Sequence, residues 1–214
     1  MATKGKITVL MMLIGCAIFF SNCNPIRFDC TENKHTFSAT IQAYPNLDSI
    51  HIGDTIWFAL TIPTQLTDKV TNQVIDYSNA ENLGGDMGFG KFNVVGNEND
   101  PGVIPAADDF DYSIKIGNAL SNPVLPAQNR NFGFTESNGQ YKFELGVIPR
   151  QAGVFIMSMG DIANVFRKTD RCTKAFFGIS FVNTNQHLYF IEQNRPGYIL
   201  SEFDKAHSYC VKVK

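Results

Sequence analysis

The clearest cluster of side chains that could do chemistry is an acidic stretch, DDFD, in which Asp108, Asp109 and Asp111 follow two upstream acids, Glu98 and Asp100. Carboxylate oxygens are the ligands that Ca²⁺ prefers, and loops between strands often supply them. Asp109 and Asp111 also stand two residues apart in an alternating segment, which is typical of the solvated face of a strand, where carboxylates discourage edge pairing. We therefore treat Asp108, Asp109 and Asp111 as metal candidates, although the pattern favours the solvated face.

The histidines give no local metal or general-base motif. The chain contains His35, His51, His187 and His207, and successive histidines are 16, 136 and 20 positions apart. His51 stands between Ile50 and Ile52 and so points out of a predicted strand. This position indicates a solvated histidine without a catalytic partner.

Other potential catalytic residues lack a recognisable pattern. Ser180 lacks the second glycine of the G-x-S-x-G elbow of a hydrolase. The two acids of a glycoside hydrolase can be remote in sequence, so Asp161, Asp170 and Glu192 leave a secreted, glycan-active hydrolase open as an alternative. Trp57 points away from its apolar neighbours and either packs on the second face of a sheet or forms a ligand platform. No cofactor motif occurs, so we expect no cofactor and favour a protein that is not an enzyme.

The composition predicts a mostly β domain that could position such residues. The chain of 214 residues has 18 Phe, and its 19 Ile outnumber its 11 Leu. Aromatic and β-branched side chains suit a pleated surface better than a helix face. The 17 Gly and 9 Pro favour tight turns between many short strands.

Alternating apolar and polar residues predict strands along most of the chain. They occur at 36–44, 50–62, 110–116, 131–145 and 208–213, with turns at Gly53-Asp54 and Ser137-Asn138-Gly139. Residues 64–86 are polar and predict a long loop. Asp161 could cap a short helix near 161–168, with Ile162 and Val165 on one face, and a second helix is possible near 184–193.

The N-terminal segment predicts export. Lys4 and Lys6 precede an apolar run over residues 7–20, as in a secretory signal peptide. The alternative, an uncleaved membrane anchor, needs about 20 apolar residues, and the polar Ser21 comes too early for it. Without the two lysines, 16 basic residues face 20 acidic ones, so the mature chain carries a net charge of −4. This balance argues against a nucleic-acid partner.

Two cysteines near the end of the apolar run could be acylated. LIGC at 13–16 resembles the bacterial lipobox, but apolar residues continue beyond its Cys16. FSNC at 20–23 stands at the end of the run and has Asn22 where a smaller residue is usual. It resembles the relaxed, Ser-rich lipobox of Bacteroidetes-type lipoproteins. Placement favours lipidation of Cys23, with Cys16 as the alternative.

Cysteine arithmetic leaves the disulfides open. If Cys16 is acylated, four cysteines remain and two disulfides are possible; if Cys23 is acylated, Cys30, Cys172 and Cys210 remain. In the second case we expect a disulfide between Cys172 and Cys210, which would stabilise the fold by about 3 to 4 kcal/mol in the chain-entropy model. Cys210 would lie on an edge and Cys30 would be the free thiol.

Residues 148–161 resemble the E–F corner of immunoglobulin-like domains, with Phe155 in place of the tyrosine. This resemblance implies an immunoglobulin-like β-sandwich. The signal region and the style of the mature chain resemble uncharacterised, membrane-anchored lipoproteins of the Bacteroidetes type, which implies a location but no activity.

We expect a signal peptide over 1–22, a tether over 23–33 and a single β-sandwich domain over 34–214. The expected protein is an exported lipoprotein of the cell envelope, anchored at the outer membrane or cell surface through its N-terminal acyl chains. Its sandwich is expected to be a non-catalytic binding or assembly module for an envelope protein or a glycan.

Overall fold

The computed structural model describes residues 33–81, 83–93, 102–120 and 128–214, which belong to one compact unit, Glu32–Lys214. Cys16 and Cys23, on which the lipidation prediction rests, lie outside the described residues, as do Cys30, Glu98 and Asp100. Within the described ranges, no helix is long and apolar enough to cross a membrane.

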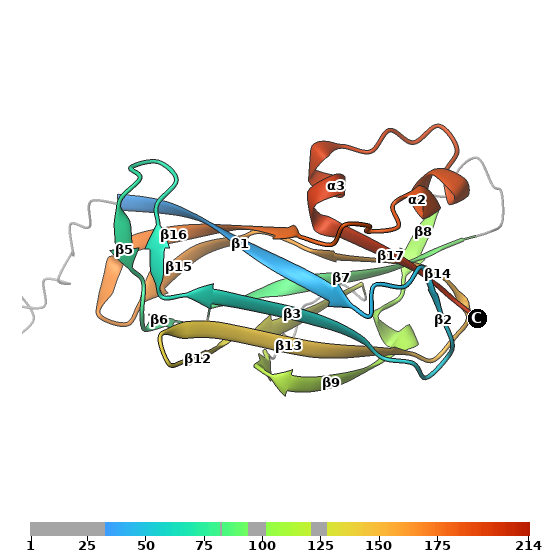
Figure 1. The fold of residues 1–214 in the computed structure, drawn as a ribbon, viewed down its shortest axis with the longest axis horizontal. Helices are drawn as coiled ribbons and strands as arrows, with labels where there is room; N and C mark the ends of the chain where they lie inside the picture. The colour runs from blue at the N-terminus through green and yellow to red at the C-terminus, as the bar shows by residue number, and fades with distance from the viewer. Residues whose placement is uncertain (1–32, 82, 94–101, 121–127) are drawn as a thin grey trace, which may run out of the picture. The chain divides into compact units, whose positions relative to one another are not determined.

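The described residues form two main sheets, which confirms the mostly β prediction. Sheet A has eight strands, seven of them in the spatial order β12 (Thr135–Ser137), β13 (Gln140–Pro149), β3 (Ile56–Pro63), β1 (Asn33–Tyr44), β16 (Asp170–Phe181), β15 (Ile162–Arg167) and β6 (Ala80–Glu81). The eighth, β9 (Phe110–Ile116), pairs with β13. Figure 1 shows β1, β3 and β13 running side by side.

Sheet B has seven strands. Six follow the order β10 (Asn118–Ala119), β11 (Asn129–Gly133), β7 (Gly84–Phe92), β14 (Gly153–Met159), β17 (Ser208–Val213) and β2 (Ser49–Ile50), and β8 (Val103–Pro105) pairs with β7. The remaining elements are the hairpin β4 (Gln65–Thr67) and β5 (Val74–Asp76), the short helix η1 (Ala107–Asp109), and helices α2 (Tyr189–Asn194) and α3 (Glu202–His207).

Aromatic and aliphatic side chains from alternate strand positions form one core. The strand patterns place Phe58 and Phe143 of sheet A and Phe155 and Tyr209 of sheet B in this core with almost no exposed surface. Such alternation is what a two-layer sandwich requires of strands with one buried face. The structure supports a β-sandwich, and its immunoglobulin-like character stays a prediction.

The turn between β12 and β13 is where the sequence predicted a hairpin. Asn138 and Gly139 both have positive φ, 51° and 70°, as a two-residue hairpin turn requires. The Gly53-Asp54 turn is also present, with Gly53 at φ 87°. Its flanking strands lie in different sheets, since β2 pairs with β17 and β3 pairs with β1 and β13.

The helix expected near 161–168 is wrong, because these residues form strand β15. A β-bulge separates Ile162, which faces Phe177, from Val165, which faces Ala175. Two residues, Ala163 and Asn164, therefore oppose the single residue Phe176, and the inward side chains of Ile162 and Val165 acquire a three-residue spacing that imitates a helix. The second predicted helix corresponds to α2, which begins at Tyr189.

The long loop expected over 64–86 is also wrong. The segment contains the β4–β5 hairpin, β6 and the start of β7. It also contributes Tyr77, whose side chain is fully buried and whose hydroxyl donates a hydrogen bond to the Val165 carbonyl at 2.6 Å. A buried hydroxyl needs such a partner, so Tyr77 helps to fix this polar segment to the core.

The expected Cys172–Cys210 disulfide is not formed, because Cys210 is a free thiol. Tyr209, Val211 and Val213 point into the core as predicted, and Cys210 lies on the opposite face of β17. That face is covered rather than solvated, because Phe190 and Ile191 of α2 pack on it. Burial raises the pKa of the Cys210 thiol to about 12.

We expect Cys210 to resist a thiol-alkylating reagent in the native protein and to react in denaturant without any reductant. Reactivity requires an exposed thiolate, and the native fold denies Cys210 both exposure and ionisation. Peptide mapping by mass spectrometry measures both states. A linked peptide containing Cys172 and Cys210 would show that the disulfide forms after all.

Candidate functional site

A groove with a cavity volume of about 510 Å³ lies over β7, on the outer face of sheet B. Its floor comes from Gly84, Gly85 and Gly88, and its sides from β11, the β14–β15 connection and α3. A second cavity of about 240 Å³ shares Gly88, Asn129, Ser158 and other lining residues with the first. The two cavities therefore form one groove, which continues along β7 toward Gly90.

The floor of the groove is low because β7 carries glycines at positions that face outward. A β-carbon on Gly88 would lie 2.6 Å from the Ser158 hydroxyl oxygen, and one on Gly90 would lie 2.5 Å from a methyl group of Val103. Both distances are shorter than van der Waals contact, so neighbouring side chains already occupy the space. Glycine at these positions lets the side chains of Ser158 and Val103 lie directly against the backbone of β7, and Gly88 still lines both cavities.

The two strands that flank β7 place polar side chains across the groove. Asn129 of β11 and Ser158 of β14 are the lateral partners of Gly88 on its two sides. Because directly opposed residues of antiparallel strands share one face, the amide and the hydroxyl stand on either side of a residue without a side chain. This arrangement follows from the register alone.

Helix α3 forms the wall opposite β11. It begins with a capping box: the Ser201 hydroxyl accepts a hydrogen bond from the Asp204 amide at 3.0 Å, and the Asp204 carboxylate accepts one from the Ser201 amide at 3.0 Å. Hydrogen bonding from the Ser201 hydroxyl lowers the pKa of Asp204 below its usual range. The helix has six residues, so this cap fixes much of its length.

His207 fastens α3 to the sandwich. Its Nε2 lies 3.0 Å from Oδ1 of Asp161, and its Nδ1 lies 2.8 Å from the carbonyl oxygen of Phe203. The same Asp161 oxygen also accepts a hydrogen bond from the Ile179 amide at 2.8 Å. These contacts join α3 to the β14–β15 connection and to β16. The sequence predicted Asp161 as a helix cap and gave His207 no partner.

Phe203 presents an oriented aromatic ring to the groove. The ring stacks on the His207 imidazole with centroids 3.9 Å apart and an interplanar angle of 15°. Phe203 is nevertheless 55% exposed, and it lines both cavities. One side of the ring is thus fixed by His207, and a large part of the residue remains open to a ligand.

The described residues that line the groove carry acidic side chains but no lysine, arginine or histidine. The acids are Asp86, Asp161 and Asp204. With the Asn129 amide and the Ser158 hydroxyl, they supply several acceptors and a few donors. The groove can therefore bind a ligand rich in hydroxyl groups and disfavours an anion.

The structure does not bring the predicted metal candidates together. Asp108 pairs with Arg130, Asp109 lies 3.9 Å from the ammonium of Lys91, and Asp111 lies 3.8 Å from the guanidinium of Arg150. The described residues contain no group of three or more His, Cys, Asp or Glu side chains that could hold a metal ion. Each acid faces a different base, so the stretch acts as a set of separate surface ion pairs.

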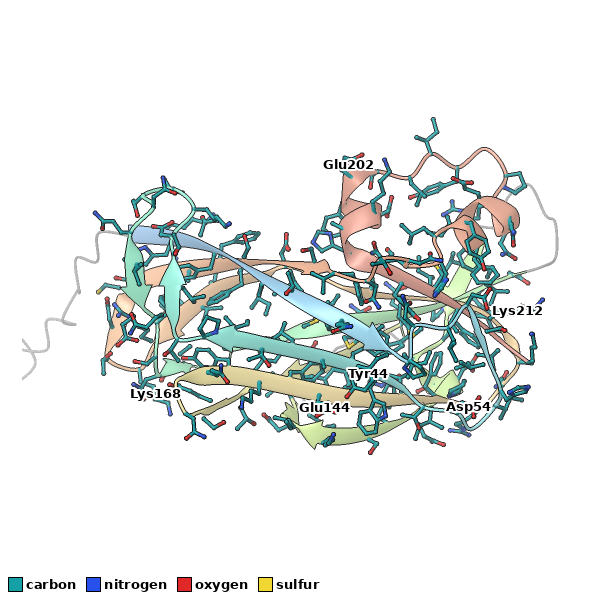
Figure 2. The ribbon with its side chains drawn as sticks, in the orientation of Figure 1. Tyr44, Asp54, Glu144, Lys168, Glu202 and Lys212 are labelled. Carbon is teal, nitrogen blue, oxygen red and sulfur yellow. The ribbon has the colours of Figure 1, made fainter. Side chains whose placement is uncertain are left out.

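Trp57 belongs to a cluster on the outer face of sheet A. Its indole lies over Gly146, where a β-carbon would be 3.1 Å from two indole atoms, and the Lys115 ammonium lies 5.5 Å from the ring centroid. Lys115 also binds Glu144 at 2.7 Å, and Glu144 accepts a hydrogen bond from the Tyr44 hydroxyl. Figure 2 shows Tyr44 and Glu144 close together on this face. These groups satisfy one another, which favours the packing interpretation of Trp57.

The remaining predicted residues lie apart from the groove. His51 is exposed, as predicted, with its Nδ1 3.5 Å from Asp54. His187 is buried, and its Nε2 lies 3.1 Å from the Asn46 side-chain oxygen. Asp170 binds Arg167 at 3.0 Å at the β15–β16 turn.

Comparisons with known proteins do not assign the chain to a family. No protein-family model and no curated protein matches it. The chain is similar to a solved chain described as PbICP-C in complex with falcipain-2, with 10% identity and a TM-score of 0.22 over 71% of this chain and 92% of that one. It is also similar to the CupB6 tip adhesin from Pseudomonas aeruginosa, with 11% identity and a TM-score of 0.20 over 71% of this chain and 42% of that one. At these TM-scores, neither similarity supports an argument about this chain.

The sequence contained one signal of the groove. In GGDMGFGKF, glycines at 84, 88 and 90 occupy positions of one parity, which places all three on one face of a strand. Because residues 64–86 were predicted to form a loop, the spacing of these glycines was not recognised as that of one face of a strand. Asn129, Ser158 and Phe203 offered no comparable signal, because only the fold brings β11, β14 and α3 to the same strand.

Proposed function

We propose that the chain is an exported lipoprotein of the cell envelope whose β-sandwich is a non-catalytic binding module, and that the groove over β7 is its binding site. One observation carries the choice of site: glycines of β7 make a low floor between polar side chains and an exposed, oriented aromatic ring. A concave site with a few convergent polar groups is the usual form of a ligand site.

The location rests on the N-terminal sequence. Lys4, Lys6 and the apolar run support export, and FSNC supports acylation of Cys23, with Cys16 as the alternative. We propose that acyl chains on Cys23 hold the protein at the outer membrane or cell surface, where an envelope protein or a glycan is within reach. Palmitate labelling in a lipoprotein-processing bacterium tests this, and we expect Cys23→Ala to abolish labelling and Cys16→Ala to leave it.

The alternative function is a glycan-active hydrolase, and one observation favours it: Asp86 and Asp161 line the same cavity. Glycoside hydrolases use such a pair, one member of which must donate a proton. Oδ1 of Asp161 already accepts hydrogen bonds from His207 and Ile179, so its contacts within the fold account for the position of this carboxylate without catalysis. We therefore prefer the binding module.

Filling the groove should abolish binding. The experiment compares the full-length chain, reconstituted in lipid vesicles, with Gly88→Leu and Asn129→Trp, and measures retention of labelled polysaccharide and protein fractions from the envelope. Thr61→Leu is the matched control, because Thr61 is exposed on the outer face of sheet A. We expect both groove variants to lose retention and the control to keep it. Equal retention by all four proteins would contradict the proposed site, and no retention by the unmodified chain would contradict the binding function.

A further inference from the structure

The groove has a stacking platform at its rim. The Phe203 ring stacks on the imidazole of His207. The two nitrogens of this imidazole are within hydrogen-bonding distance of the Phe203 carbonyl oxygen and of the Asp161 carboxylate. The ring therefore has little freedom to lose when a ligand covers it. An aromatic face of this kind packs well against the flat C–H surface of a pyranose, and aromatic contacts contribute beyond the area they bury.

The polar side chains along the floor suit hydroxyl groups. Asn129 supplies an amide donor and acceptor, and Ser158 a hydroxyl that does both. The carboxylates of Asp86 and Asp161 add acceptors at one end of the groove, and that of Asp204 adds one near the other. A sugar hydroxyl donates and accepts at once, so it can use every member of this set.

The charge of the groove selects among ligands. Three carboxylates, unaccompanied by any lysine, arginine or histidine among the described lining residues, repel phosphates and acidic sugars. The floor also excludes one common mode of peptide binding. Strand β7 is paired with β11 over Gly84–Gly88 and with β14 over Met87–Lys91, so at Met87 and Gly88 its backbone has no free edge to which an extended peptide could add.

These observations deepen the proposed binding function and rest on it. We infer that the groove binds a neutral glycan chain, with one sugar stacked on Phe203 and its neighbours hydrogen-bonded along Asn129, Gly88 and Ser158. The two connected cavities, of about 510 and 240 Å³, give the groove room for more than one sugar.

The test measures affinity of the full-length chain, solubilised in detergent, by titration calorimetry. The probes are four neutral hexasaccharides (cellohexaose, chitohexaose, maltohexaose and mannohexaose), the anionic hexagalacturonate, and an octalysine peptide. We expect at least one neutral probe to bind and hexagalacturonate not to bind. Phe203→Ala should weaken binding about tenfold, Phe203→Trp should retain it, and Tyr189→Ala should not change it, since Tyr189 is exposed outside the groove.

Three results would overturn the inference, and a fourth would overturn the non-catalytic function on which it rests. Octalysine could bind in place of every hexasaccharide, which would assign the acids to a cationic ligand. A hexasaccharide could bind equally to Phe203→Ala and Asn129→Ala, which would place glycan binding elsewhere. The absence of any hexasaccharide binding, with groove-dependent retention of an envelope fraction, would end the glycan inference and leave the proposed function standing. Cleavage of a hexasaccharide, detected by mass spectrometry, would replace the non-catalytic module with the hydrolase.

Discussion

Replacing Phe177 with alanine is expected to lower the free energy of unfolding by about 3–5 kcal/mol. Phe177 has no exposed surface, and its ring centroid lies 5.2 Å from that of Phe37 and 5.9 Å from that of Tyr77. The three rings come from β16, β1 and the β5–β6 connection, so no single element can close the cavity that alanine would leave. Urea denaturation, followed through the fluorescence of Trp57, the only tryptophan in the chain, measures the loss.

The adjacent residue, Phe176, is the control. It points to the opposite face of β16, is only partly buried, and has the Lys34 ammonium 5.7 Å from its ring centroid. A partly exposed ring beside one cation contributes little, so Phe176→Ala should cost about 1 kcal/mol or less. The reverse order of the two losses would mean that β16 is shifted by one residue, because such a shift exchanges the faces of every side chain.

Strand character and inward faces were predictable where the alternation was regular. Tyr209, Val211 and Val213 illustrate this, because each reports its face through a period of two that needs no tertiary information. The bulge in β15 defeated the same rule, because one inserted residue converts that period into the spacing of a helix. Cys210 shows a different limit: its face was correct, but its burial depends on α2, which arrives from elsewhere in the sequence.

The groove was less predictable than the fold. The floor of the groove lies in one strand, so its glycines are regularly spaced in the sequence. The polar side chains at its rim come from the strands that flank β7, and the sequence does not show which strands these are. The His207–Asp161 contact joins residues 46 positions apart that share no motif. The residues of a site built from neighbouring strands of a sheet are far apart in the sequence, because strand order is set by the packing of the whole core.

The β4–β5 hairpin is held by a buried carboxylate. Asp68 is 1% exposed, and one of its oxygens accepts hydrogen bonds from the amides of Thr36 and Val70, at 3.2 and 3.0 Å. The other oxygen faces Nδ1 of His35 at 3.0 Å and accepts a hydrogen bond from the Thr71 hydroxyl at 3.1 Å. Burial alone would raise the pKa of Asp68, but the hydrogen bonds from Val70, His35, Thr36 and Thr71 outweigh it and lower the pKa to about 2.

Asp68→Ala is therefore expected to lower the free energy of unfolding by about 3 kcal/mol at pH 7, because it leaves buried donors without an acceptor. Asp68→Asn should cost less, since its amide oxygen can still accept from the two backbone amides. Asp54→Asn is the matched control, because Asp54 also lies beside a histidine, His51, but its side chain is 53% exposed. This control should cost well under 1 kcal/mol.

The cost of Asp68→Asn should also depend on pH. The folded chain holds the pKa of Asp68 at about 2, below its ordinary value of 3.8, so the carboxylate's contribution is complete above about pH 4 and is lost as the pH falls toward 2. The shift corresponds to about 2 kcal/mol. Urea titrations between pH 2 and 7 should show the unmodified chain and Asp68→Asn converging on acidification. A constant gap for Asp68→Asn would contradict the prediction, because it would mean that folding does not shift the pKa of Asp68.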